Sequence, residues 1–240
     1  MNKYYGIIVS SIAGISTLVG YLFIYIKADK NKVISKSLSF ASGVMLTLSL
    51  VDLIPTSINY LKMDNRSLLY TLLFFFIGII LCLIINTKIK DNDVLYKTGI
   101  ISMIGIMIHN IPEGIVTYIL SLVDMKLGLI FAIAIILHNI PEGISISVPI
   151  YYSKKSKKEA FLYTMISGLS EPLGALLSMI FLYKYISNFL IAILFSLIAG
   201  LMSYISIFEL MKTSFKYDKN KIYILYGSFF ILIVEILLKI

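Results

Sequence analysis

Eight apolar stretches constrain this chain more than any other feature of its sequence. A helix needs about 20 apolar residues to cross the hydrocarbon core of a bilayer. The stretches cover Tyr5–Ile26, Ile34–Leu61, Ser67–Asn86, Lys97–Leu122, Leu127–Tyr152, Ala160–Tyr185, Asn188–Met211 and Lys221–Lys239. Because the connections between them are short, we expect one all-α transmembrane domain over residues 1–240. It would be a polytopic membrane protein with eight transmembrane helices.

The composition supports a bilayer as the solvent of this chain. Hydrophobic residues make up 59% of the sequence and charged residues only 14%, whereas soluble domains carry about a quarter charged residues. The single cysteine, Cys82, excludes internal disulfides and cysteine-rich metal sites. The net charge of +8 comes from lysines scattered in short loops. We therefore expect the lipid bilayer as a partner and exclude nucleic acid.

The distribution of basic residues predicts the orientation. Fifteen of the 21 Lys and Arg residues lie within Lys27–Lys36, Lys88–Lys97, Lys154–Lys158 and Lys212–Lys221, all at one side of the predicted spans. The other side holds the remaining six. Since loops rich in Lys and Arg stay in the cytoplasm, we expect a multi-pass protein of the cell (plasma) membrane. Both termini would be extracytoplasmic.

Two internal repeats are visible in the sequence. The motif HNIPEGI occurs at His109–Ile115 in span 4 and again at His138–Ile144 in span 5. A fainter pair relates Ala41–Leu53 of span 2 to Ile198–Leu210 of span 7, with chance similarity between apolar helices as the alternative. The members of each pair run in opposite directions through the bilayer. This arrangement is typical of inverted repeats that enclose a binding site near the midplane.

Five ionisable side chains lie in the middle of predicted spans. These are His109, Glu113, His138, Glu142 and Glu171. An ionisable group at the bilayer centre costs a few kcal/mol or more unless it has a partner. Interhelical hydrogen bonds are the alternative explanation, but a bound cation would satisfy all five groups together.

The spacing within each motif strengthens the metal interpretation. Residues three and four apart share a helix face, so each copy presents an imidazole, a carboxylate and the carboxamide of Asn110 or Asn139 together. Pro112 and Pro141 each leave a backbone carbonyl without its usual donor. Imidazole, carboxamide and carboxylate ligands suit Zn²⁺, Fe²⁺, Mn²⁺ or Co²⁺. The predicted metal ligands are His109, Asn110, Glu113, His138, Asn139, Glu142 and Glu171.

Three further acidic residues have weaker signals. Asp52 and Glu209 occupy matching positions of the span 2 and span 7 repeat and could form part of an ion pathway. The alternative is that each reaches toward the membrane interface from near a helix end. Glu235, four residues before Lys239, is interpreted as one half of an interfacial ion pair.

These motifs resemble those of the ZIP family (Zrt-, Irt-like proteins) of divalent-metal transporters, in particular its compact bacterial branch. The resemblance covers the whole chain and rests on HNIPEG in spans 4 and 5 and on SGLSEPLGAL in span 6. It implies an inverted 3+2+3 helix bundle, in which two three-span repeats flank spans 4 and 5. The histidine-rich loop that many members carry between spans 3 and 4 is absent, since that segment reads NTKIKDNDVLYK.

The resemblance also implies two adjacent metal positions. One would use His109, Glu113, His138 and Glu142, and the other Asn110, Glu113, Asn139, Glu142 and Glu171. Family members also keep an acidic residue in span 2, which Asp52 matches. The implied function is import of divalent cations, mainly Zn²⁺ with Fe²⁺, Mn²⁺ and Co²⁺ in addition, without enzymatic activity.

Two other functions stay open at this point. An intramembrane di-metal hydrolase could use the same ligands to activate water. A selective divalent-metal channel of the same fold would share every motif. A homodimer likewise stays open beside a monomer.

Overall fold

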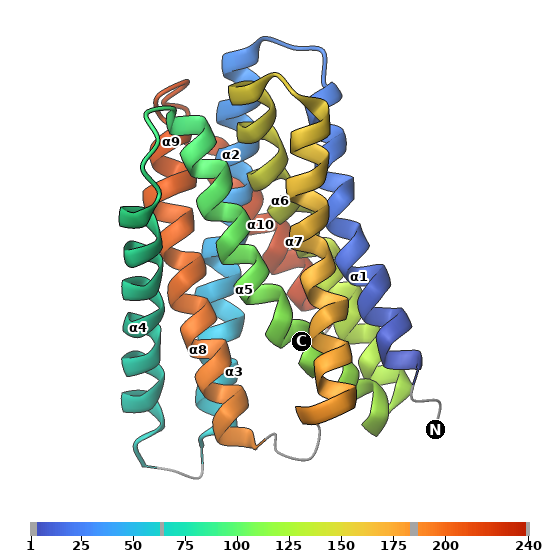
Figure 1. Ribbon diagram of the computed structural model, residues 1–240. Helices are drawn as coiled ribbons and strands as arrows, with labels where there is room; N and C mark the ends of the chain where they lie inside the picture. Colours follow the sequence, from blue (N-terminus) through green and yellow to red (C-terminus); the bar gives the residue numbers. More distant parts are fainter. Residues whose placement is uncertain (1–3, 63–64, 183–186, 239–240) are drawn as a thin grey trace.

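The computed structural model describes residues 4–62, 65–182 and 187–238, and this part of the chain is helical without any strand (Figure 1). The α-helices are α1 (Tyr5–Tyr21), α2 (Lys30–Leu48), α3 (Ile54–Tyr60), α4 (Ser67–Lys88), α5 (Val94–Val123), α6 (Met125–Lys154), α7 (Lys157–Leu177), α8 (Asn188–Tyr204), α9 (Lys212–Ser214) and α10 (Ile222–Leu238). Four short segments complete them: the 3₁₀ turn η1 (Leu22–Tyr25) and the π-helical segments η2 (Ser49–Leu53), η3 (Ser178–Leu182) and η4 (Ile205–Met211).

The predicted spans are found as continuous helical units. Seven of them are long and apolar enough to cross a membrane, and α10 adds an apolar helix of 17 residues within the described part. The ends predicted for spans 6 and 8, Tyr185 and Lys239, lie outside the described residues. The prediction of an all-helical, polytopic membrane protein is confirmed.

Apolar side chains cover much of the outer surface. α4 shows this most clearly, because four large apolar side chains on it are at least half exposed: Leu69, Leu73, Phe76 and Ile80. In water such a surface would be costly, whereas lipid tails accept it. Cys82, on the opposite side of α4, lies buried in the core.

The connections between helices are short and are stabilised by acidic caps. Asp124 alone separates α5 from α6, and its carboxylate accepts a hydrogen bond from the backbone N–H of Lys126 at 2.7 Å. Asp93 caps α5 and accepts hydrogen bonds from the N–H of Leu95 and the hydroxyl of Ser153. Partial burial opposes ionisation of Asp93, yet these hydrogen bonds hold its pKa below the usual range. All four lysine-rich connections lie at the same end of the bundle (top of Figure 1).

The packing of the helices is symmetric in the way that inverted repeats require. α1 packs on α6 as α7 packs on α5, and α10 packs on α2 as α4 packs on α8. α1, α5, α6 and α7 thus form one group of helices, and α2, α4, α8 and α10 form a second group beside it (Figure 1). The largest connection between the groups is that of α2 with α6.

Glycines mark the closest approaches, and they too occur in matched pairs. A Cβ at Gly143 of α6 would overlap the carbonyl oxygen of Thr17 in α1, and a Cβ at Gly114 of α5 would overlap that of Glu171 in α7. Small residues allow helices to approach closely in membranes. This pairing reveals a repeat that the sequence analysis missed: IAGISTLVG in α1 (Ile12–Gly20) corresponds to ISGLSEPLG in α7 (Ile166–Gly174).

The repeat between spans 2 and 7 is visible in local backbone structure as well. Asp52 lies in η2 and Glu209 lies in η4, so each of these carboxylates is carried by a π-helical segment. In span 2, Pro55 lies just after this segment, at the start of α3, and has no backbone N–H to donate to the carbonyl of Val51. Such segments re-aim side chains within a helix and are frequent at functional sites.

Candidate metal centre

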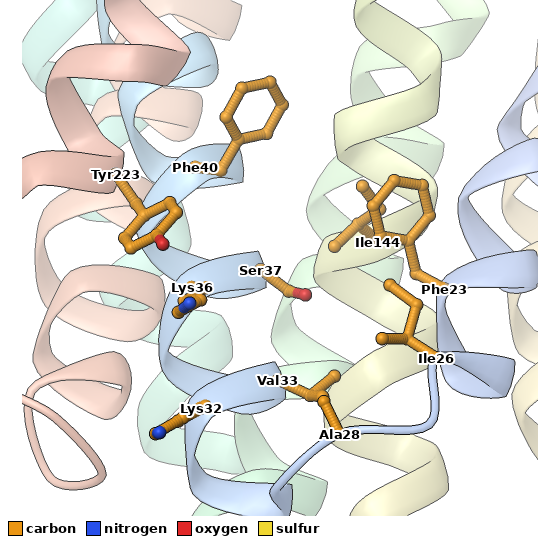
Figure 2. Close-up of a pocket in the computed structure, with 10 residues that line it drawn as sticks. All are labelled: Phe23, Ile26, Ala28, Lys32, Val33, Lys36, Ser37, Phe40, Ile144 and Tyr223. Atoms are coloured by element: carbon orange, nitrogen blue, oxygen red, sulfur yellow. The ribbon is translucent and has the colours of Figure 1, made fainter.

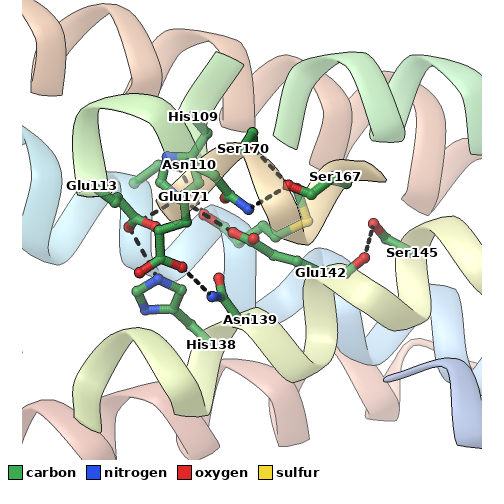
Figure 3. Close-up of polar contacts among 12 residues, drawn as sticks. His109, Asn110, Glu113, His138, Asn139, Glu142, Ser145, Ser167, Ser170 and Glu171 are labelled. Atoms are coloured by element: carbon green, nitrogen blue, oxygen red, sulfur yellow. Dashed lines mark hydrogen bonds and ion pairs between the residues drawn. The ribbon is translucent and has the colours of Figure 1, made fainter. Parts of the chain in front are cut away.

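The seven predicted ligands come together in the structure, midway along α5, α6 and α7 (Figure 3). All of them are buried, with His138 the most exposed at 5%. The HNIPEG copies position them because α5 and α6 continue through Pro112 and Pro141, which keeps the motif residues on the facing sides of two adjacent helices. Glu171 reaches the same point from α7, where Gly114 and Gly174 let α5 and α7 approach closely.

Glu113 is at the centre of the imidazole contacts. Its Oε1 lies 3.0 Å from Nε2 of His138 and 3.1 Å from Nε2 of His109. Nε2 of His109 also lies 3.2 Å from Oε1 of Glu142. The ligand atoms of His109, Glu113 and His138 all fall within 4.8 Å of one another, close enough to hold one metal ion.

The two contacts of His109 are short without being hydrogen bonds. The ring nitrogens of His109 and the carboxylate oxygens of Glu142 have no hydrogen-bond partner, so these contacts have the distance of a hydrogen bond without its direction. Side chains that converge without aligning on each other are expected where they aim at a common cation. Imidazole nitrogen and carboxylate oxygen are ligands that Zn²⁺ accepts in proteins.

The two asparagines are oriented by backbone carbonyls. Nδ2 of Asn110 donates to the carbonyl of Ser167 at 3.2 Å, and Nδ2 of Asn139 donates to the carbonyl of Ala13 at 2.9 Å. Asn139 also donates to Oε2 of Glu171 at 2.9 Å. Since a carbonyl oxygen can only accept, the nitrogens must face these groups, and the Oδ1 atoms remain for another partner.

Unsatisfied oxygens gather around this point. Oδ1 of both asparagines, one oxygen each of Glu113 and Glu171, and both oxygens of Glu142 are buried without a hydrogen-bond partner. Leaving one such polar atom unpaired costs about 1–3 kcal/mol, and more when it is charged. A divalent cation would satisfy these oxygens together, so the arrangement fits a metal site.

A small cavity lies beside this cluster. It measures about 20 Å³, enough for about one water molecule. Glu113, His138, Asp52 and Glu235 all line it. The position of Asp52 beside the cluster favours the pathway interpretation over an interfacial one.

Glu235 lies beside the cluster, a position that its interpretation as an interfacial residue did not include. Its expected partner, Lys239, lies outside the described residues, and the carboxylate of Glu235 lines the cavity beside Asp52. No sequence signal indicated this position, because α10 is apolar on all sides and its sequence does not show which side faces the bundle. Glu235 is therefore a functional candidate that the sequence analysis missed.

Glu209 lies toward the lysine-rich end, on the opposite side of the cluster along the bundle axis. It is buried and accepts a hydrogen bond from Nδ2 of Asn86 at 2.7 Å. A cavity of about 160 Å³ beside it is also lined by Asp91 and by three lysines, Lys97, Lys212 and Lys216. Asp52 thus shares a cavity with the cluster residues Glu113 and His138, whereas Glu209 lines a separate cavity that none of the seven predicted ligands lines.

Comparison with known proteins agrees with this geometry. The sequence profile of one protein family, described as ZIP zinc transporter, matches residues 88–237. The chain belongs to the ZIP family. The matched region contains both HNIPEG copies, Glu171, Glu209 and Glu235, so the family match covers most of the site described above.

Curated relatives of this ZIP-family chain are similar over nearly its whole length. A protein named zinc transporter ZupT from Streptococcus mutans is 38% identical, with 96% of each chain covered. Proteins of the same name from Chlorobaculum parvum and Clostridium perfringens are 34% and 32% identical, covering 95% and 99% of this chain and 94% and 96% of their own. The ZIP resemblance is confirmed. The family consists of transporters rather than enzymes, which argues against the hydrolase alternative.

Proposed function

We propose that this ZIP-family chain imports divalent cations across the plasma membrane, mainly Zn²⁺, with Fe²⁺, Mn²⁺ and Co²⁺ as further substrates. The observation that carries the proposal is the buried cluster of His109, Glu113 and His138, whose ligand atoms lie within 4.8 Å of one another. The names of the curated relatives support zinc as the main substrate.

In this proposal the ions occupy two adjacent positions that share Glu113 and Glu142. His109 and His138 complete the first position, and Asn110, Asn139 and Glu171 complete the second. The unsatisfied oxygens of both asparagines and of Glu171 support the second position. The whole chain, residues 1–240, acts as one transmembrane domain.

The direction of transport follows from the predicted orientation. Lysine-rich connections in the cytoplasm put the face with Asp52 outside the cell and the face with Glu209 inside. Asp52 would then collect cations at entry, because a carboxylate raises the local concentration of cations. Glu209 would serve release. Glu235 shares the entry cavity with Asp52 and would assist it.

Uptake into proteoliposomes tests this function. Vesicles that enclose a zinc-reporting dye and carry the purified chain should fill with Zn²⁺ at a rate that saturates with external concentration. Glu113→Ala should reduce uptake to that of empty vesicles, since both metal positions lose a shared ligand. The matched control is Glu159→Ala, which removes a carboxylate at the start of α7, away from the cluster. Normal uptake by Glu113→Ala would contradict the proposal.

The same vesicles separate the remaining alternatives. Replacing external Zn²⁺ by Fe²⁺, Mn²⁺ or Co²⁺ measures selectivity. A channel of the same fold would show flux that stays proportional to concentration, whereas a carrier saturates. A homodimer and a monomer are distinguished by light scattering of the purified chain after subtraction of the detergent mass.

A further inference from the structure

A third cavity lies away from the metal cluster, at the lysine-rich end of the bundle (Figure 2). It lies between α2 and α10 on one side and α6 and the segment after α1 on the other. Its volume is about 390 Å³, within the usual range of about 300–1,000 Å³ for ligand cavities. It therefore lies between the two groups of helices described above.

The cavity has apolar walls and a basic rim. Phe23, Phe40 and Ile144 form the walls, and Lys32 and Lys36 stand together on α2 (Figure 2). The lysines are four residues apart, so they share one face of the helix, and both are exposed. Of the described residues that line the cavity, none is acidic.

This end of the bundle has the features of a membrane interface. Nζ of Lys36 lies 4.9 Å from the ring centroid of Tyr223, which also lines the cavity. Nζ of Lys154 lies 3.9 Å from the ring centroid of Tyr96, and Nζ of Lys157 lies 4.4 Å from that of Tyr25. Tyrosine and lysine gather at the level of lipid headgroups. The rim of the cavity is thus at headgroup depth, and its walls extend toward the hydrocarbon core.

The lining argues against a route for metal ions. The walls of this cavity are apolar and no carboxylate lines it, so nothing offsets the repulsion between its two ammonium groups and a divalent cation. The cavity beside Glu209 differs, because the carboxylates of Glu209 and Asp91 stand among its lysines. The small cavity at the metal cluster differs as well, because Asp52, Glu113 and Glu235 line it. The cavity between the two groups of helices fits an occupant that is anionic at one end and apolar at the other.

We propose that this cavity binds one anionic phospholipid from the leaflet at the lysine-rich end. Its phosphate would lie between Lys32 and Lys36, and one acyl chain would enter between Phe23, Phe40 and Ile144. Basic pockets between transmembrane helices bind anionic headgroups in this way. Such a lipid would contact both groups of helices, including α6 at Ile144, two residues after Glu142.

Native mass spectrometry of the detergent-purified full chain tests the proposal. Dioleoyl phosphatidylglycerol and dioleoyl phosphatidylcholine carry the same acyl chains and differ in net charge, so their affinities isolate the role of the lysines. The anionic phosphatidylglycerol should bind more tightly than the zwitterionic phosphatidylcholine. Each lysine near a phosphate contributes about a fivefold change in affinity. The double variant Lys32→Gln/Lys36→Gln should therefore weaken binding of phosphatidylglycerol about 25-fold.

A matched control removes the same charge elsewhere. Lys88→Gln/Lys90→Gln neutralises two exposed lysines at the same end but outside this cavity, and should change the affinity about twofold or less. Ser37→Phe fills the cavity from α2 and leaves both lysines in place. It should weaken binding of both lipids.

Three outcomes would overturn the proposal. Equal losses in the two lysine variants would mean that only the overall charge matters. Unchanged binding by a folded Ser37→Phe chain would mean that no acyl chain enters the cavity. Displacement of phosphatidylglycerol by inorganic phosphate would mean that the lysines bind an anion alone. None of these results depends on whether the chain transports zinc.

Discussion

Single residues at the metal centre are held by groups that no motif contains. The carbonyl oxygens of Ala13 and Ser167 orient the two asparagines, and Asn139 in turn donates to Glu171. The shared carboxylate of Glu113 contacts both histidines. We therefore expect unequal roles for the seven residues. Transport should require Glu113 and Glu142, whereas Asn110, Asn139 and Glu171 should mainly affect metal selectivity.

Replacing Asn139 tests this difference. Asn139→Ala removes a proposed ligand and the donor that holds Glu171, while the two histidines and Glu113 keep their contacts. Zinc affinity should fall about 10- to 100-fold, the size of effect found when groups that support a metal site are removed. Transport should change in rate and metal preference without being lost. Uptake curves for Zn²⁺ and Mn²⁺ measure this, and complete loss of uptake in a folded chain would contradict it.

Zinc binding should also depend on pH in a defined direction. Metal binds imidazole only after its proton has left, so lowering the pH must weaken binding. For a histidine of ordinary pKa, about 6.5, affinity falls about tenfold per histidine ligand between about pH 7.5 and about pH 5.5. Competition with a zinc dye gives the affinity, and His138→Gln should show a shallower dependence. A pH-independent affinity in the parent chain would show that neither histidine is a ligand.

At the scale of elements, the inverted repeat explains why the site is where it is. α5 and α6 carry the two motif copies, and α1 and α7 approach them at matched glycines. The two copies of this repeat differ at the position that matters for the metal, since Thr17 stands in α1 where α7 has Glu171. The third carboxylate therefore comes from one side only, which makes the two proposed metal positions different.

The close approach of α5 and α7 can be tested at Gly114. A Cβ there would overlap the backbone carbonyl of Glu171, which cannot move without moving α7. Gly114→Ala should destabilise the protein by about 1–3 kcal/mol and reduce transport. Gly105→Ala is the control, because its Cβ would meet only the flexible ends of Ile205 and Leu201. Thermal unfolding in detergent measures the melting temperature of each variant. Equal melting temperatures for the two variants would contradict a close approach at Gly114.

The π-helical segments carry the two proposed pathway carboxylates. If Asp52 serves entry, Asp52→Asn should raise the apparent KM for external zinc with little change in maximal rate, and Glu235→Gln should act in the same way because both line one cavity. If Glu209 serves release, Glu209→Gln should lower the maximal rate with little change in KM. Steady-state uptake curves decide this. Variants that behave like the parent would return these residues to a structural role.

At the scale of the whole molecule, the lysine-rich connections share one end of the bundle, and their orientation is a prediction that labelling can test. In a chain with Cys82→Ala, single cysteines at Asn65 and Ser156 would lie on opposite faces. An impermeant thiol reagent applied to intact cells should modify Asn65→Cys and spare Ser156→Cys. The reverse pattern would invert the proposed direction of transport.

The sequence by itself determined the features that depend on local pattern. Apolar stretches of membrane length identify the spans, and the spacing of His109 and Glu113 places both on one face of a helix, because helical periodicity is a property of neighbouring residues. The repeated motif pointed to a metal site at mid-depth for the same reason. The structure brings those seven side chains together without exception.

The tertiary structure alone decided the contacts between residues far apart in the chain. Asn139 donates to Ala13, 126 residues away, and Glu235 joins Asp52 and Glu113 at one cavity. The sequence placed Glu235 at the interface because an apolar helix such as α10 does not show which side faces its neighbours. Likewise, the correspondence of Thr17 with Glu171 emerged only when matched glycines showed α1 and α7 in equivalent positions. Helix packing, rather than local pattern, determines which side chains share a cavity.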